Sequence, residues 1–197
     1  MTYLGTILTF VFVENVVLTY FLGICPFLVS TRNSRTAAIL SLVLTLTMGL
    51  LALITWAVRH LILVPLNAEY LQLIVFALLI GGTSQLLFGF LRRWSPRLIS
   101  QARRYFVLLA ANSSLFGVLL ISSYRSYGAL ESVLAAVSAG VGLLLALVAL
   151  AAVRERLEYE RIPAAFRGGP ILLISAGLFS LAFHAFDKLL LLKLLGN

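Results

Sequence analysis

Six long apolar runs, separated by short polar breaks, constrain this chain more than any other feature of its sequence. Hydrophobic residues make up 61% of its 197 residues and charged residues only 11%, against ~45–50% and ~25% in soluble domains. A run of ~20 apolar residues crosses a bilayer as a helix, and the period-two alternation of membrane strands is missing. The composition excludes a soluble enzyme, a disordered chain and a disulfide-rich secreted module. It predicts an all-α integral membrane protein with six transmembrane helices, over residues 3–29, 37–58, 71–91, 105–121, 130–153 and 170–192.

The basic residues are distributed unevenly between the two sides of this predicted bundle. Eleven of the 15 lysines and arginines fall in the loops after the first, third and fifth spans. Positive loops stay in the cytoplasm, so we expect these loops inside and both termini outside. The net charge of +8 then reflects cytoplasmic loops rather than a nucleic-acid surface.

Six spans divide into two halves of three, at about residues 1–95 and 96–197, within one membrane domain. An odd number of spans in each half gives the halves opposite orientations, and in such folds broken helices meet near the midplane. The first span of each half carries an asparagine followed by a glycine: Asn15 and Gly23 in one, Asn112 and Gly117 in the other. This pattern predicts an inverted repeat.

The first span contains three residues that point to function. Pro26 either breaks the helix near Gly23 or only ends it at the cytoplasmic face. Glu14, a carboxylate inside the span, is either a residue of an ion path or a neutral group bonded to its neighbours. Cys25, the single cysteine, is either a packing residue or a functional thiol, and a continuous helix would place it on one face with Glu14.

The third span contains a polar stretch, Gly81-Gly82-Thr83-Ser84-Gln85. Small residues let membrane helices approach closely, and hydroxyl and amide side chains hydrogen-bond across such contacts, so we expect this stretch to pack against a neighbouring helix. Gln85 is also a candidate for an ion path. The chain has no His/Cys/Asp cluster with metal-ligand spacing and no nucleotide-binding motif.

Several separated motifs resemble the A subunit of the Rnf complex and the homologous E subunit of the sodium-translocating NADH:quinone oxidoreductase (Nqr). The resemblance covers almost the whole chain and rests on these stretches: Glu14-Asn15, Gly23-Ile24-Cys25-Pro26, Pro65-Leu66-Asn67, Gln85, Ser95-Pro96, Arg154-Glu155-Arg156-Leu157, Pro163-Ala164, Phe166-Arg167-Gly168 and Ala176-Gly177-Leu178.

The resemblance implies a subunit of a bacterial inner-membrane redox pump that couples electron transfer from ferredoxin or NADH to outward movement of Na⁺ or H⁺. It implies a partner subunit of inverted topology (the Rnf E or Nqr D type), with two cysteines from each subunit holding one shared [2Fe–2S] cluster. Cys25 stands where the family has its first ligand. Asn15, Asn112 and Ser113 would line the cluster pocket, and this chain alone would have no catalytic activity.

The sequence departs from the family at two positions. Ser113 stands in place of the second cysteine, and Phe88 stands where the family tends to have an acid. A serine hydroxyl is a poorer ligand than a thiol at neutral pH. The cluster is therefore either kept with an unusual ligand or lost, and in the second case the chain would be a small transporter or structural subunit on the same scaffold.

Overall fold

The fold was analysed in a computed structural model, which describes residues 3–13, 15–23, 34–94, 112–157, 159–160 and 162–194. Every regular element within these ranges is a helix. The predicted all-α class is therefore confirmed for the part of the chain that the structure describes.

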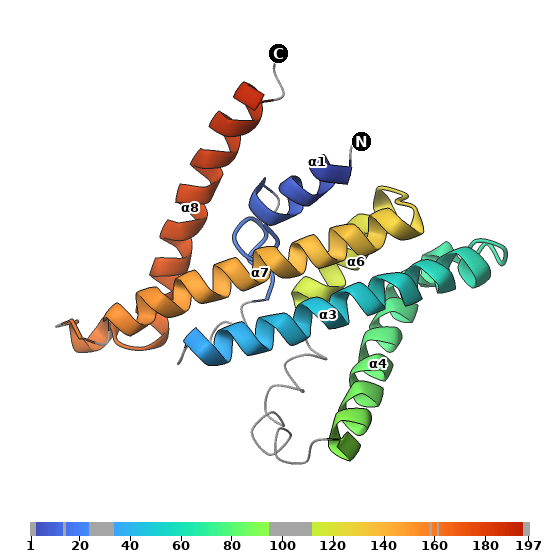
Figure 1. Cartoon of the computed structure of the whole chain (residues 1–197), viewed down its shortest axis with the longest axis horizontal. Helices are drawn as coiled ribbons and strands as arrows, with labels where there is room; N and C mark the ends of the chain where they lie inside the picture. The colour runs from blue at the N-terminus through green and yellow to red at the C-terminus, as the bar shows by residue number, and fades with distance from the viewer. Residues whose placement is uncertain are drawn as a thin grey trace.

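Two long helices form the centre of the molecule, α3 (Ser34–Val58) and α7 (Ala129–Leu157). Figure 1 shows them side by side over most of their length. Glycines allow this close packing, because a Cβ atom added at Gly140 of α7 would lie 2.8 Å from the Thr45 Cα of α3. Membrane helices associate through such small-residue contacts, since lipid tails are as apolar as leucine.

Two further helices, α4 (Gln72–Trp94) and α8 (Gly169–Leu194), extend from opposite sides of this pair in Figure 1. Short helical turns lead into them: η2 (Arg59–Leu63) and η3 (Glu69–Leu71) precede α4, and η4 (Ala164–Phe166) precedes α8. Large apolar side chains on the outer faces of the long helices are exposed, as expected of surfaces that face lipid; they include Leu46, Leu50, Leu53, Leu78, Leu86, Leu178 and Leu181.

Three helical segments are long and apolar enough to cross a membrane, namely Ser41–Leu63, Glu69–Leu86 and Ala129–Leu157. Two shorter apolar helices accompany them, Ser113–Tyr124 and Gly169–Phe183. These segments overlap five of the six expected spans. The total of six crossings and the outside position of the termini stay predictions.

The expectation of one long first helix over residues 3–29 is wrong. Within the described residues of this span, the helix consists of α1 (Tyr3–Leu8) and the π-helical turn η1 (Thr9–Val13), and residues 15–23 form turns and irregular backbone. The break therefore begins about ten residues before the expected position at Gly23–Pro26. The continuous helix that would place Glu14 and Cys25 on one face does not exist, although Glu14, Cys25 and Pro26 themselves lie outside the described residues.

The fourth expected span, residues 105–121, is also not one continuous helix. Helix α6 (Ser113–Tyr124) begins in the middle of it, after Asn112, whose φ of −78° and ψ of 107° are extended. The helix starts there because Asn112 is an N-cap: its side chain accepts a hydrogen bond from the Ser114 amide. Residues 105–111 lie outside the described part of the chain.

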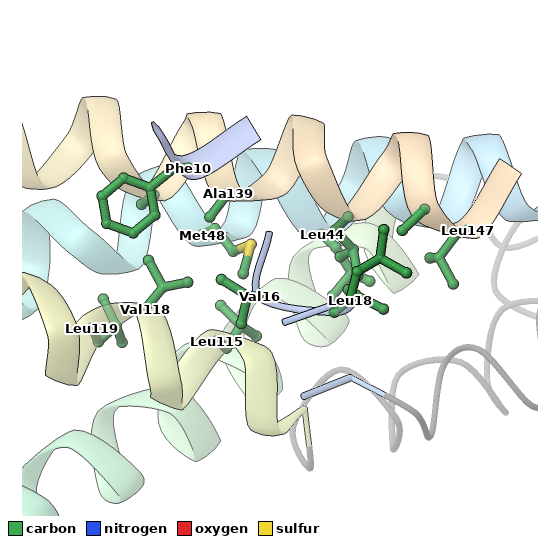
Figure 2. Close-up of a cluster of buried hydrophobic side chains, with 14 of the residues drawn as sticks. Phe10, Val16, Leu18, Leu44, Met48, Leu115, Val118, Leu119, Ala139 and Leu147 are labelled. Atoms are coloured by element: carbon green, nitrogen blue, oxygen red, sulfur yellow. The ribbon is translucent and has the colours of Figure 1, made fainter. Parts of the chain in front are cut away.

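The hydrophobic core lies where the broken first segment passes between α3, α6 and α7. Figure 2 shows Val16 and Leu18 of the broken segment among Leu44, Met48 and Leu115, and all five side chains are almost fully buried. Burial of these apolar side chains holds the irregular segment in place. Two backbone hydrogen bonds within it add to this, from the Thr19 amide to the Asn15 carbonyl at 2.8 Å and from the Leu22 amide to the Val16 carbonyl at 3.2 Å.

Candidate functional site

Asn15 fixes the break in the first segment. Its side chain is 1% exposed. The Nδ2 atom donates to the carbonyl oxygens of Val11 at 3.2 Å and Gly142 at 2.9 Å, and Oδ1 accepts from the Val17 amide at 3.1 Å. The polar groups of non-helical backbone inside a membrane need hydrogen-bond partners from the protein. The Asn15 side chain provides such partners on both sides of the break and links the break to α7.

The segment that follows Asn15 ends at Gly23, which contacts the start of α6. The Gly23 amide donates to the Ser113 Oγ atom at 3.0 Å. Gly23 has a φ of 87°, and a Cβ atom there would lie 3.0 Å from the Ser114 Oγ atom, so both the backbone and the space require glycine. The structure thus brings the break of the first half against the helix start of the second, 90 residues apart in sequence.

Asn112 stabilises the start of α6 at this contact. Its Oδ1 atom accepts from the Ser114 amide at 3.0 Å and from the Ser114 hydroxyl at 2.6 Å. Its Nδ2 atom is buried and has no hydrogen-bond partner in the part of the chain that the structure describes. A buried donor without an acceptor is costly, so this amide is suited to a polar group held at the same place. We call Asn15, Gly23, Asn112, Ser113 and Ser114 the helix-break junction.

Of the predicted site residues, Asn112 and Ser113 lie together beside Gly23. Asn15 lies at the other end of the broken segment, where it contacts Val11, Val17 and Gly142. Ser113 is exposed at the surface of the isolated chain, whereas Asn112 and Ser114 are buried. An exposed hydroxyl at the junction is accessible to a partner subunit. Gln85, in contrast, lies exposed on α4.

Two residues of the site were not predicted from the sequence. Gly142 supplies the carbonyl that Asn15 binds, and a Cβ atom on it would lie 3.0 Å from the Phe10 carbonyl oxygen. The Ser180 hydroxyl of α8 donates to the Leu18 carbonyl at 2.5 Å and so ties α8 to the turns. The run of small residues from Ala135 to Gly142 was a usable signal for close packing.

Among the described residues there is no group of three or more His, Cys, Asp or Glu side chains that could hold a metal ion. The junction offers hydroxyl, amide and backbone groups instead. Its chemistry is that of a polar break in an apolar bundle, which is where membrane transport proteins place their sites.

Replacing Gly23 with alanine is expected to weaken the junction. The alanine Cβ atom is strained by the left-handed backbone conformation and also contacts the Ser114 hydroxyl. Together these two effects should lower the free energy of unfolding by about 2–4 kcal/mol. Gly168→Ala is the matched control, because Gly168 has a φ of 86° but nothing within 4 Å of a Cβ atom. Thermal unfolding of the detergent-solubilised protein should show the larger loss for Gly23→Ala. Equal losses would mean that the contact with α6 contributes nothing.

Almost the whole chain is similar in sequence to known membrane subunits. Residues 3–190 match the family model described as Rnf-Nqr subunit, membrane protein. The chain is 38% identical over 187 residues to the A subunit of the Na⁺-translocating ferredoxin:NAD⁺ oxidoreductase complex of Acetobacterium woodii, covering 95% of this chain and 97% of the relative. It is 38% identical over 179 residues to the A subunit of the ion-translocating oxidoreductase complex of Syntrophotalea carbinolica (91% and 93% covered). For the A subunit of the same kind of complex in Edwardsiella ictaluri, the identity is 39% over 187 residues (95% and 97% covered). The chain therefore belongs to the Rnf-Nqr family of membrane subunits.

Proposed function

We propose that this chain is the A-type membrane subunit of an Rnf/Nqr-type complex in a bacterial inner membrane, where it relays electrons across the bilayer coupled to transport of Na⁺ or H⁺. The single observation that carries the proposal is the match over almost the whole chain to the A subunits of ion-translocating oxidoreductase complexes. The helix-break junction supports it, because ion-coupled membrane proteins place their sites where interrupted helices meet.

The proposed architecture has six crossings arranged as two inverted halves, residues 1–95 and 96–197, with both termini outside. Asn15 and Asn112 support this repeat, since each marks the interruption in the first segment of its half. The central pair α3 and α7 and the outer helices α4 and α8 would be the equivalent elements of the two halves. Ser113, the exposed residue of the junction, would face a homologous membrane subunit of inverted topology.

The iron–sulfur part of the proposal concerns Cys25 and Ser113. A [2Fe–2S] cluster takes four ligands, normally thiolates. The chain has one cysteine, and the hydroxyl of Ser113 already accepts a hydrogen bond from Gly23. This chain cannot supply two of the four thiolates, as an equal share between two subunits would require. We therefore propose no electron-transfer step through the cluster. Cys25 would be its one thiolate ligand here, Asn15 and Asn112 would line the pocket, and Glu14 and Gln85 are candidates for the ion path.

A second candidate function is favoured by one specific contact. The Ser113–Gly23 hydrogen bond joins the two broken segments directly at 3.0 Å, and it engages the hydroxyl that replaces the family's second thiol. A chain whose junction is held in this way could serve as a transporter or structural subunit that has lost the redox centre. The two candidates differ in iron content, which makes them separable.

Iron content and EPR spectroscopy of the purified complex test the redox proposal. We expect a [2Fe–2S] signal in the wild-type complex that disappears in Cys25→Ser, because the chain has no other thiolate to replace Cys25. Ser113→Cys should strengthen the iron binding by adding a softer ligand. Ser175→Ala, which removes a hydroxyl bonded only within α8, is the control. An unchanged signal in Cys25→Ser would favour the second candidate.

A further inference from the structure

A small cavity lies between α3, α4, α6 and α7, away from the helix-break junction. Its volume is about 20 Å³, enough for one water molecule or one monatomic ion. Hydroxyl groups and one guanidinium supply its polar wall, and apolar side chains close the rest. It is lined by Ala52, Thr55, Trp56, Arg59, Phe76, Leu119, Ser122, Ser123, Tyr127 and Ser132.

Two polar groups of this cavity have no hydrogen-bond partner among the described residues. They are the Nε atom of Arg59 and the Oγ atom of Ser122, and both atoms are buried. The whole Ser122 side chain is 5% exposed. Arg59 lies within the membrane-capable segment Ser41–Leu63, where an ionised side chain without a partner is expensive. It also begins the π-helical turn η2, and such turns occur frequently at functional sites.

The Thr55 and Ser123 hydroxyls of the wall have hydrogen-bond partners of their own. The Thr55 hydroxyl donates to the Leu51 carbonyl at 2.7 Å, and the Ser123 hydroxyl accepts from Gln72 at 2.5 Å. No aspartate or glutamate is among the residues that line the cavity. An unpaired guanidinium nitrogen and an unpaired hydroxyl, both able to donate, therefore face a space without a negative charge.

We propose that this cavity binds a monatomic anion of the halide class, held by Arg59 and Ser122. Charge decides between an anion and a water molecule, because the Arg59 guanidinium is cationic, its Nε atom is buried, and a counter-ion stabilises a cation more than a neutral dipole does. The size of the cavity favours a halide over a phosphate, because a volume of about 20 Å³ is too small for a central atom with four oxygens. The anion would join η2, which contains Arg59, to α6, which contains Ser122.

A second cavity of about 320 Å³ offers a route for exchange of the ion. It shares Arg59 and Ser123 with the first cavity and is further lined by Glu69, Tyr70 and Tyr124, among others. Tyr70 is 80% exposed and Tyr124 is 85% exposed. Such amphipathic rings are typical of a membrane–water interface, so the route would open to the aqueous side.

Equilibrium binding of radioactive chloride to the purified complex tests this site. We expect saturable binding that bromide displaces and gluconate does not. Arg59→Gln should raise the dissociation constant about 10- to 100-fold, because it removes the charge, and Ser122→Ala about 3- to 10-fold, because it removes one hydrogen bond. Arg93→Gln, at an exposed arginine of α4, is the matched control and should bind chloride like the wild type.

Ser122→Ala keeps the test decisive if Arg59→Gln reduces the amount of folded protein, since it removes only one oxygen atom. Absence of saturable chloride binding in the wild type would overturn the proposal and assign the cavity to water. Equal binding by the wild type and Ser122→Ala would overturn it too, because any chloride retained would then belong to another site of the complex.

Discussion

Alanine in place of Gly140 is expected to lower the free energy of unfolding by about 2–3 kcal/mol, although it adds only one methyl group. The new Cβ atom would lie 2.6 Å from Oγ1, 2.7 Å from Cγ2 and 2.8 Å from Cα of Thr45. Rotation of the Thr45 side chain could relieve the first two contacts but not the contact with Cα. The backbones of α3 and α7 would therefore have to move apart, and the central contact of the fold would loosen.

The matched control for Gly140→Ala is Gly82→Ala in α4. Nothing lies within 4 Å of a Cβ atom at Gly82, so alanine there should be neutral or stabilising by up to ~1 kcal/mol through its helix propensity. Thermal unfolding in detergent should give a melting temperature roughly 5–10 °C lower for Gly140→Ala. Similar melting temperatures for the two variants would contradict the close packing of α3 on α7.

The glycines of α4 and α7 show where sequence patterns failed to predict packing. The stretch from Gly81 to Gln85 was expected to contact another helix; Ser84 is buried, but within the described part of this chain nothing lies within 4 Å of a Cβ atom at Gly81 or Gly82. The Thr83 and Ser84 hydroxyls donate to the carbonyls of Leu79 and Ile80, one turn earlier in their own helix. Close packing occurs at Gly140 and Gly142 instead. A run of small residues permits close helix packing, but the tertiary arrangement decides which of these runs contacts another helix.

The all-α class and the approximate positions of five apolar segments could be predicted, because length and hydropathy alone determine whether a segment is long and apolar enough to cross a membrane. The breaks could not be placed in this way. Residues 15–23 are as apolar as a helix would be, and two distant groups, the Gly142 carbonyl and the Ser113 hydroxyl, help to hold them in a non-helical conformation. Such contacts become visible only in three dimensions, although the two asparagines did mark the segments concerned.

Removal of the Asn15 amide is expected to have the largest effect of any substitution at the helix-break junction. Asn15→Leu leaves no cavity, because leucine is at least as large as asparagine, so the expected loss comes from hydrogen bonds. The Val17 amide would lose its acceptor, and the Val11 and Gly142 carbonyls would each lose a donor, all in a buried setting. At about 1–3 kcal/mol for each group left unsatisfied, we expect a total loss of about 3–5 kcal/mol.

The control for Asn15→Leu is Asn67→Gly, which removes the same amide from an exposed position while keeping its left-handed φ of 49° available. Its stability should change by less than ~0.5 kcal/mol. Asn15→Asp separates the role of the donor from that of the acceptor: a carboxylate still accepts from Val17 but cannot donate to Val11 or Gly142. If the two donated bonds hold the break against α7, Asn15→Asp will unfold in detergent at nearly the same temperature as Asn15→Leu. A melting temperature near that of the wild type would mean that the Val17 contact alone is sufficient.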